Sequence, residues 1–129
     1  MPYRAIDAHI HVIDPKLMHP DASKTMLGFG GVGVEQYARI IKEPDVLLKL
    51  MDEAGVDASV VVSYYAPEVM GFGYNSTEFV ADYVRRSRGR LYALGGINPW
   101  DDKLVERLEW LFSKLCLLYT SDAADDGES

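Results

Sequence analysis

Three short apolar segments alternate with three amphipathic ones along the chain, and this alternation limits the fold most strongly. The apolar segments have the length and β-branched content of strands, and the amphipathic ones repeat their apolar residues at helical spacing. In chain order the pairs are 6–12 with 44–54, 58–63 with 75–88, and 90–97 with 101–115. Strands that alternate with helices pair in parallel through right-handed crossovers. We therefore expect an α/β protein of three βα units.

Particular residues mark the ends of the helices. Pro44 suits a first helical turn, and Gly55 stands where a left-handed C-terminal cap would close the same helix. Asn75 and Glu78 resemble a capping box that opens the second helix. The connection before Pro44 is rich in Gly and Pro, so we expect mostly loop there, with one short helix over 34–42.

The first predicted strand alternates polar and apolar side chains. Its odd positions carry Asp7, His9 and His11 on one face, and its even positions are all apolar. Buried polar groups without partners cost about 1–3 kcal/mol each. A divalent metal would remove that cost and give both imidazoles a ligand role. We therefore predict that His9 and His11 are metal ligands, the alternative being two hydrogen-bonded core histidines.

Other residues near this face are candidates for supporting roles. Asp7 could orient a ligand histidine from outside the metal's own ligands, or act as an ordinary hydrogen-bonding acid. Tyr64 and Tyr65 follow the second predicted strand in an aromatic loop. They could wall a substrate pocket, or simply pack that loop onto the fold. Asn75 could reach the pocket or cap its helix.

Two folds accommodate three parallel βα units, a doubly wound sheet and an eight-stranded α/β barrel. Histidines at the carboxyl end of the first strand favour the barrel, because barrel active sites are built at that end. A complete barrel needs about 250 residues. We therefore expect residues 1–115 to be the N-terminal three βα units of an incomplete TIM (β/α)8 barrel. A doubly wound binding domain is the weaker alternative.

The composition is that of a globular protein, with 48% hydrophobic and 26% charged residues. No apolar run reaches the 18 residues or so of a membrane span, so we expect no membrane partner. The net charge of −7 argues against a nucleic-acid partner. The start of the chain lacks the apolar region of a signal peptide, which predicts a cytoplasmic protein.

The last fourteen residues, 116–129, differ from the rest of the chain. Residues 116–126 resemble the translation of a transposon-end adapter from a sequencing library. The helical pattern stops there, and an acidic tail without Lys or Arg follows. Without it, sixteen acidic residues face thirteen basic ones, a net charge of −3. We expect residues 116–129 to be a non-native, disordered tail, the alternative being a natural disordered tail.

Four blocks within 1–115 carry a family resemblance. They are Ile6-Asp7-Ala8-His9-Ile10-His11, residues 50–57 followed by 60–62, Asn75, and residues 90–99. In this order and spacing the blocks resemble the amidohydrolase-related metal-dependent hydrolases. The most similar subgroup includes aminocarboxymuconate-semialdehyde decarboxylase and related aromatic-acid decarboxylases. The resemblance covers almost all of residues 1–115.

The resemblance implies that His9 and His11 bind a divalent metal, most often Zn²⁺, at the mouth of the barrel. It also implies further His and Asp ligands from later strands, so no catalytic residue is assigned within 1–115. The favoured function of the parent protein is a metal-dependent hydrolase acting on a small organic acid, lactone or amide. A non-oxidative decarboxylase of the same family is the alternative, and a truncated, inactive fragment is the alternative of another class. The expected partner is the small-molecule substrate, and homo-oligomerisation of the parent is left open.

Overall fold

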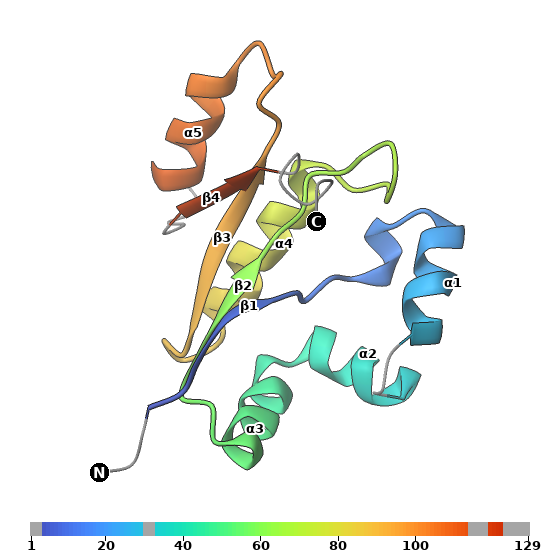
Figure 1. The fold of residues 1–129 in the computed structure, drawn as a ribbon, viewed down its shortest axis with the longest axis vertical. Coiled ribbons are helices and arrows are strands. Elements are labelled where there is room, and N and C mark those ends of the chain that lie inside the picture. The colour runs from blue at the N-terminus through green and yellow to red at the C-terminus, as the bar shows by residue number, and fades with distance from the viewer. Residues whose placement is uncertain (1–3, 30–32, 114–118, 123–129) are drawn as a thin grey trace.

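The computed structural model describes residues 4–29, 33–113 and 119–122, and within them the fold is mixed α/β (Figure 1). The sheet is parallel, with its strands in the order β1-β2-β3-β4. The strands are β1 (Ile6–Ile10), β2 (Ala58–Val62), β3 (Leu91–Ile97) and β4 (Tyr119–Asp122). The helices are α1 (Pro20–Phe29), α2 (Val34–Lys42), α3 (Pro44–Ala54), α4 (Tyr74–Arg85) and α5 (Leu104–Ser113), with a 3₁₀ turn at Pro15–Leu17.

The βα alternation is confirmed, and α3 matches its prediction at both ends. Gly55 adopts φ 72°, the left-handed conformation in which a residue with a Cβ is strained, and its amide donates to Asp52 O. Two local predictions are wrong. Asn75 lies inside the first turn of α4, which begins after Gly73, so the capping box is absent from that helix. The connection before α2 contains α1, although its Gly and Pro content predicted loop.

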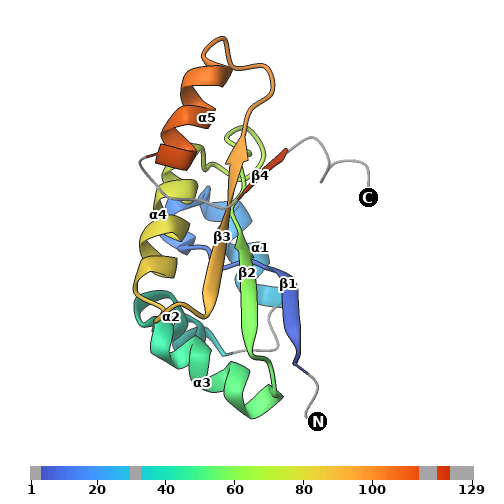
Figure 2. The ribbon, with the colours of Figure 1, turned by 90° about the vertical axis from the view of Figure 1, so that its left-hand side faces the viewer.

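The helices α3, α4 and α5 lie on one side of the strands (Figure 2). The main hydrophobic core forms between these helices and β2 and β3. Its fully or nearly fully buried members include Leu48, Met51, Val61, Val80, Tyr83, Leu91, Ala93 and Leu111. A second cluster, around Ile13, Met18 and Phe72, packs the loop after β2 against the segment that follows β1. The core thus sits on one face of the sheet.

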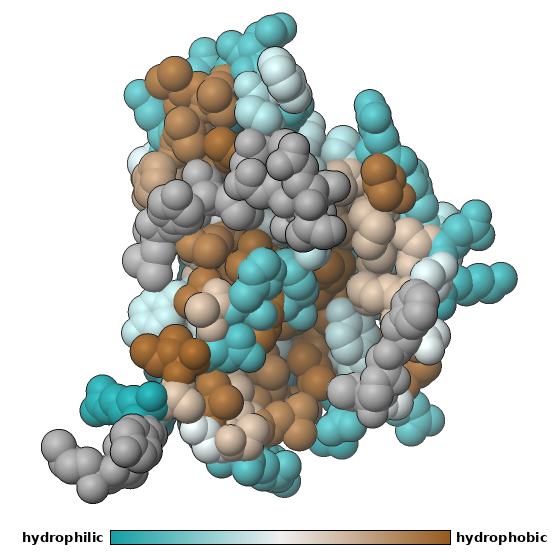
Figure 3. Space-filling view, viewed as in Figure 1, coloured by the Kyte–Doolittle hydropathy of each residue, from teal (hydrophilic) through white to brown (hydrophobic). Residues whose placement is uncertain are grey.

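The other face of the sheet carries apolar side chains without a helix over them (Figure 3). Ile6 of β1 is 64% exposed and Tyr92 of β3 is 42% exposed. Single exposed apolar side chains are common on proteins. A group of them on one sheet face usually marks a surface that is covered by another part of the protein or by a partner.

β1 differs from the predicted first strand. We expected the apolar side chains at the even positions of 6–12 to share one face, but Ile10 and Val12 pack in the core whereas Ile6 is exposed. The register against β2 shifts between Asp7 and Ile10, where β1 has one more residue than its partner. Such an irregularity breaks the alternation of faces. β1 also lies at the end of the strand order, so the described residues cover it on one edge only.

β4 lies within the segment 116–129 that we predicted to be a non-native tail, and the structure has a strand there over Tyr119–Asp122. The strand pairs in parallel with β3, from Leu94 opposite Tyr119 to Ile97 opposite Asp122. The free edge of β3 offers unpaired backbone N–H and C=O groups, which an extended segment of almost any sequence can satisfy. The remainder of the predicted tail, 116–118 and 123–129, lies outside the described residues.

We expect Tyr83→Phe to destabilise the fold by about 1–2 kcal/mol. The Tyr83 side chain is fully buried, its hydroxyl donates to Ile40 O at 2.6 Å, and burial raises the pKa of Tyr83, which keeps the donor protonated. Residue 44, four positions after Ile40, is a proline without an N–H, so Tyr83 supplies a donor that the backbone lacks.

The free energy of unfolding from urea titration measures this loss, and Tyr92→Phe is the matched control. It removes the same atom from an exposed ring and should change stability by less than about 0.5 kcal/mol. Equal effects of the two substitutions would contradict the role assigned to the Tyr83 hydroxyl.

Candidate functional site

His9 and His11 meet at the carboxyl end of β1. The Nε2 atoms of the two rings are 2.9 Å apart, and the rings are nearly perpendicular, with centroids 4.7 Å apart and an interplanar angle of 77°. His9 lies on β1 and His11 directly follows its last residue, Ile10. Both imidazoles therefore direct the same nitrogen at one point, as their spacing along the strand predicted.

The protonation of His11 is determined by the neighbouring strand. His11 Nδ1 lies 2.8 Å from Val62 O at the end of β2, and a carbonyl oxygen only accepts, so Nδ1 carries the hydrogen. His11 Nε2 is then an unprotonated acceptor in the neutral ring. Metal-binding histidines commonly have this arrangement, in which one ring nitrogen donates to a carbonyl and the other presents its lone pair.

We call His9 and His11 the histidine pair. Tyr64 packs directly on it. Its ring stacks on that of His11 with centroids 4.1 Å apart, and its hydroxyl lies 2.7 Å from His11 Nε2. The fully buried Phe72 lies on its other side, with ring centroids 6.0 Å apart. Tyr64, one of the three residues predicted to line a pocket, thus contacts the pair.

Asp7 contacts the backbone beside the pair. Its Oδ1 accepts a hydrogen bond of 3.2 Å from the backbone N–H of His9, at the point where the register of β1 shifts. The partner that orients the His11 ring is instead Val62 O. Asp7 thus supports the conformation of β1, and its role in orienting a ligand histidine stays a prediction.

The two Nε2 atoms of the pair are spaced nearly as two zinc ligands would be. Zn–N distances of about 2.0–2.1 Å in a tetrahedral site place two ligand nitrogens about 3.3 Å apart, close to the 2.9 Å between the two Nε2 atoms. Within the described residues, however, no group of three or more His, Cys, Asp or Glu side chains could hold a metal ion. The pair therefore supplies two ligands at most.

The end of β2 is held in place by a buried polar cluster that sequence reasoning missed. Ser63 Oγ lies 2.9 Å from Thr77 Oγ1 and accepts from the backbone N–H of Gly96 at 2.8 Å. A Cβ on Gly96 would lie 3.0 Å from both Ser63 O and Tyr65 N. β3 therefore needs glycine there to let the chain pass from β2 to Tyr64. The consecutive glycines 95 and 96 in a strand were the available sequence signal.

A separate cleft of about 570 Å³ lies between the loops that follow β2 and β3. We call it the aromatic cleft; its lining includes Tyr65, Glu68, Val69, Asn98 and Trp100. Trp100 is 86% exposed.

The predicted pocket residues thus occupy three different places. Tyr64 lies on the histidine pair and Tyr65 lines the aromatic cleft. Asn75 Oδ1 accepts from the backbone N–H groups of Gly73 and Ser76 and stays at the start of α4.

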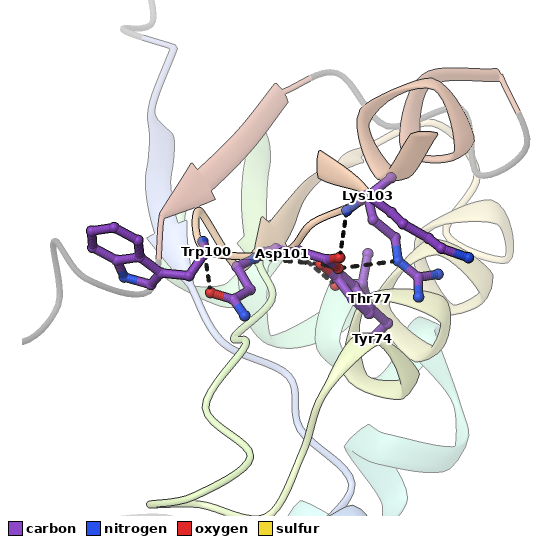
Figure 4. Close-up of polar contacts among 8 residues, drawn as sticks. Tyr74, Thr77, Trp100, Asp101 and Lys103 are labelled. Carbon is purple, nitrogen blue, oxygen red and sulfur yellow. Dashed lines mark hydrogen bonds and ion pairs between the residues drawn. The ribbon is translucent and has the colours of Figure 1, made fainter. Parts of the chain in front are cut away.

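Tyr74, Asp101 and Arg107 form a hydrogen-bonded group beneath the loop after β3 (Figure 4). The Tyr74 hydroxyl donates to Asp101 Oδ2 at 2.9 Å, Arg107 Nε lies 3.4 Å from the same oxygen, and the guanidinium lies over the Tyr74 ring. Burial, followed by the bond to Asp101, raises the pKa of Tyr74 to about 12. The backbone N–H of Lys103, then Tyr74 and Arg107, lower the pKa of Asp101. Figure 4 shows Trp100 directed away from this group.

Comparison of the chain with protein-family models, with curated proteins and with solved structures found no match. The described helices include none that is both long and apolar enough to cross a membrane.

We expect Asp101→Asn to lower stability at neutral pH and to matter less as the pH falls. The pKa of Asp101 is lower in the folded state than in the unfolded state, so the unfolded chain binds more protons through that window. The stabilisation is present above the unfolded value of about 3.9 and is lost as the pH falls through the lower folded value.

Urea unfolding at pH 7 and at about pH 3 measures the difference between wild type and variant. The exposed neighbour Asp102→Asn serves as the control for charge removal at the same helix start. A difference between wild type and Asp101→Asn that stays constant with pH would refute the contribution of the ionised carboxylate.

Proposed function

We propose that the histidine pair is part of a divalent metal site, and that the chain derives from a metal-dependent hydrolase of the amidohydrolase-related type. One observation carries this proposal: the two Nε2 atoms converge to 2.9 Å while His11 Nδ1 is committed to Val62 O. Two hydrogen-bonded histidines would use the same His11 lone pair, with His9 Nε2–H donating to it, so metal binding is the measurement that separates the two interpretations. Zinc is among the metals that suit imidazole ligands, and it is the one that we propose.

The barrel is the form of the α/β fold that we propose. Sequential parallel strands β1 to β3, with α3, α4 and α5 on one face, support a sector of a barrel. A doubly wound sheet has helices on both faces and reverses its strand order at one point. In a barrel, the side chains on the uncovered face, such as Tyr92, would fill the interior.

The position of the pair is consistent with that proposal. His9 and His11 stand at the carboxyl end of β1, and Tyr64 and Trp100 follow the carboxyl ends of β2 and β3. Barrel enzymes build their active sites from these ends and the loops beyond them. The aromatic cleft is accordingly our candidate for the place where the apolar part of a substrate lies.

A bound metal would supply a water of lowered pKa and polarise a substrate oxygen. The described residues around the pair would prepare His11 for the metal and supply a hydrogen-bond donor. Val62 O keeps the proton on His11 Nδ1, so that Nε2 presents its lone pair. That lone pair faces the Tyr64 hydroxyl, and a metal that displaced this contact would let the hydroxyl donate to a substrate oxygen. Further ligands must come from outside the described residues, since catalytic zinc sites use three protein ligands.

We expect the full chain to bind Co²⁺ or Zn²⁺ weakly and stoichiometrically, and His9→Ala or His11→Ala to lower the affinity about tenfold or more. Visible absorption of the Co²⁺ complex and competition by Zn²⁺ measure binding without any need for catalytic activity. The chain has three histidines, and His19→Ala is the matched control because His19 lies in the loop before α1.

The proposal fails if both substitutions leave the metal affinity unchanged, or if His19→Ala lowers it as much as they do. Circular dichroism of each variant shows that the fold is retained. His9 is exposed, so its removal creates no cavity in the core.

A further inference from the structure

A second cleft, of about 540 Å³, lies away from the histidine pair, between the segment after β1 and the helices α1, α2 and α4. We call it the basic cleft. Its apolar lining comes from four elements and consists of Pro15, Leu27, Val34, Tyr37, Ala38, Ile41 and Phe79. None of the residues that line it belongs to the histidine pair or to the aromatic cleft. Its volume is in the range of about 300–1,000 Å³ in which small-molecule sites fall.

Three cationic side chains stand around this apolar lining: Lys16, Lys42 and Arg86. Among the described residues that line the cleft, Asp14 is the one acidic side chain, and its Oδ1 accepts from the backbone N–H of Lys16. The chain as a whole carries a net charge of −7. A positively charged rim on an acidic protein is thus a local departure from the overall charge.

The cations differ in how far they are already paired. Arg86 binds Asp82 at 3.2 Å and donates to the backbone carbonyl of Lys42 at 3.0 Å. Neither Lys16 nor Lys42 takes part in the ion pairs formed among the described side chains. Arg86 is therefore held in place beside Lys42, while the two lysines have their charges available for a ligand.

The wall of the basic cleft is anchored by Tyr37. Its hydroxyl donates to Ile13 O at 2.7 Å and accepts from the backbone N–H of Ile13 at 3.4 Å. This pair of bonds joins α2 to the segment after β1, where Ile13 is buried. The cleft is therefore a feature of the packed fold and does not depend on one exposed side chain.

We propose that the basic cleft binds an organic anion with an apolar body, a medium-chain carboxylate being the simplest example. The aliphatic and aromatic lining would cover the chain, since burial of apolar surface is favourable by about 25 cal/mol per Å². Lys16 and Lys42 would bind the carboxylate by charge-assisted hydrogen bonds. The proposal does not rest on the metal site, because the two sites share no lining residue.

Isothermal titration of the full chain with decanoate, kept below its micelle concentration, tests the proposal. Two probes separate the contributions: decyltrimethylammonium keeps the apolar chain and reverses the charge, and acetate keeps the charge without the chain. We expect saturable 1:1 binding of decanoate and no comparable binding of either other probe. Absence of decanoate binding, or equal binding of the decyl cation, would overturn the proposal.

Variants then place the binding in this cleft. We expect the double substitution Lys16→Gln with Lys42→Gln to weaken decanoate binding about tenfold, as loss of charge-assisted bonds does. Lys49→Gln with Lys103→Gln removes the same charge from α3 and from the loop before α5, and should change the affinity little. Ala38→Trp narrows the cleft and should also weaken binding. Equal loss in both double variants would mean that only overall charge matters, and the assignment would be wrong.

Discussion

The parallel pairing of β1 with β2 is the constraint on which the candidate site depends. It places Val62 O beside His11 Nδ1, and that single hydrogen bond selects the tautomer that presents Nε2 toward His9. The same pairing positions Tyr64, because it follows the end of β2 and stacks on the His11 ring. A shift of register by one residue would move the Val62 carbonyl away from the ring and turn neighbouring side chains to opposite faces.

The end of β2 is itself held in place by residues that pack against it in the core. Ser63 and Thr77 satisfy each other's hydroxyls in the core, and both side chains are almost fully buried. Gly96 allows the backbone at Tyr64 and Tyr65 to pass within van der Waals distance of β3. A group that binds a ligand needs such support, because precision in a site comes from the residues that hold the first layer of side chains.

Sequence patterns predicted those features that depend on local chemistry. α3 was predicted at both ends because Pro44 and Gly55 each impose a backbone conformation, whatever packs around them. The convergence of His9 and His11 followed from the period of a strand. By contrast, the contact of Asp7 with the His9 amide depends on a shift of register between two distant segments, and no local pattern encodes it.

Tertiary packing explains the other differences. α1 forms in a segment whose Gly and Pro residues predicted loop, because Ala22 and Met26 pack against the cluster around Phe72. β4 pairs with β3 because a free sheet edge accepts backbone groups without regard to side chains. The basic cleft involves residues from 14 to 86, so its charges are distant in sequence and become a group only in the fold.

The histidine pair and the basic cleft are joined by one short segment, which raises the question of whether they communicate. His11 begins that segment, Lys16 ends it, and Val12 and Ile13 between them are 3% and 5% exposed. Coupling between two sites requires an element with two arrangements of similar free energy, which each ligand biases differently. A buried segment held by two hydrogen bonds from Tyr37 has one strongly preferred arrangement. We therefore infer that a ligand in the basic cleft leaves the geometry of the histidine pair unchanged, and that the two sites bind independently.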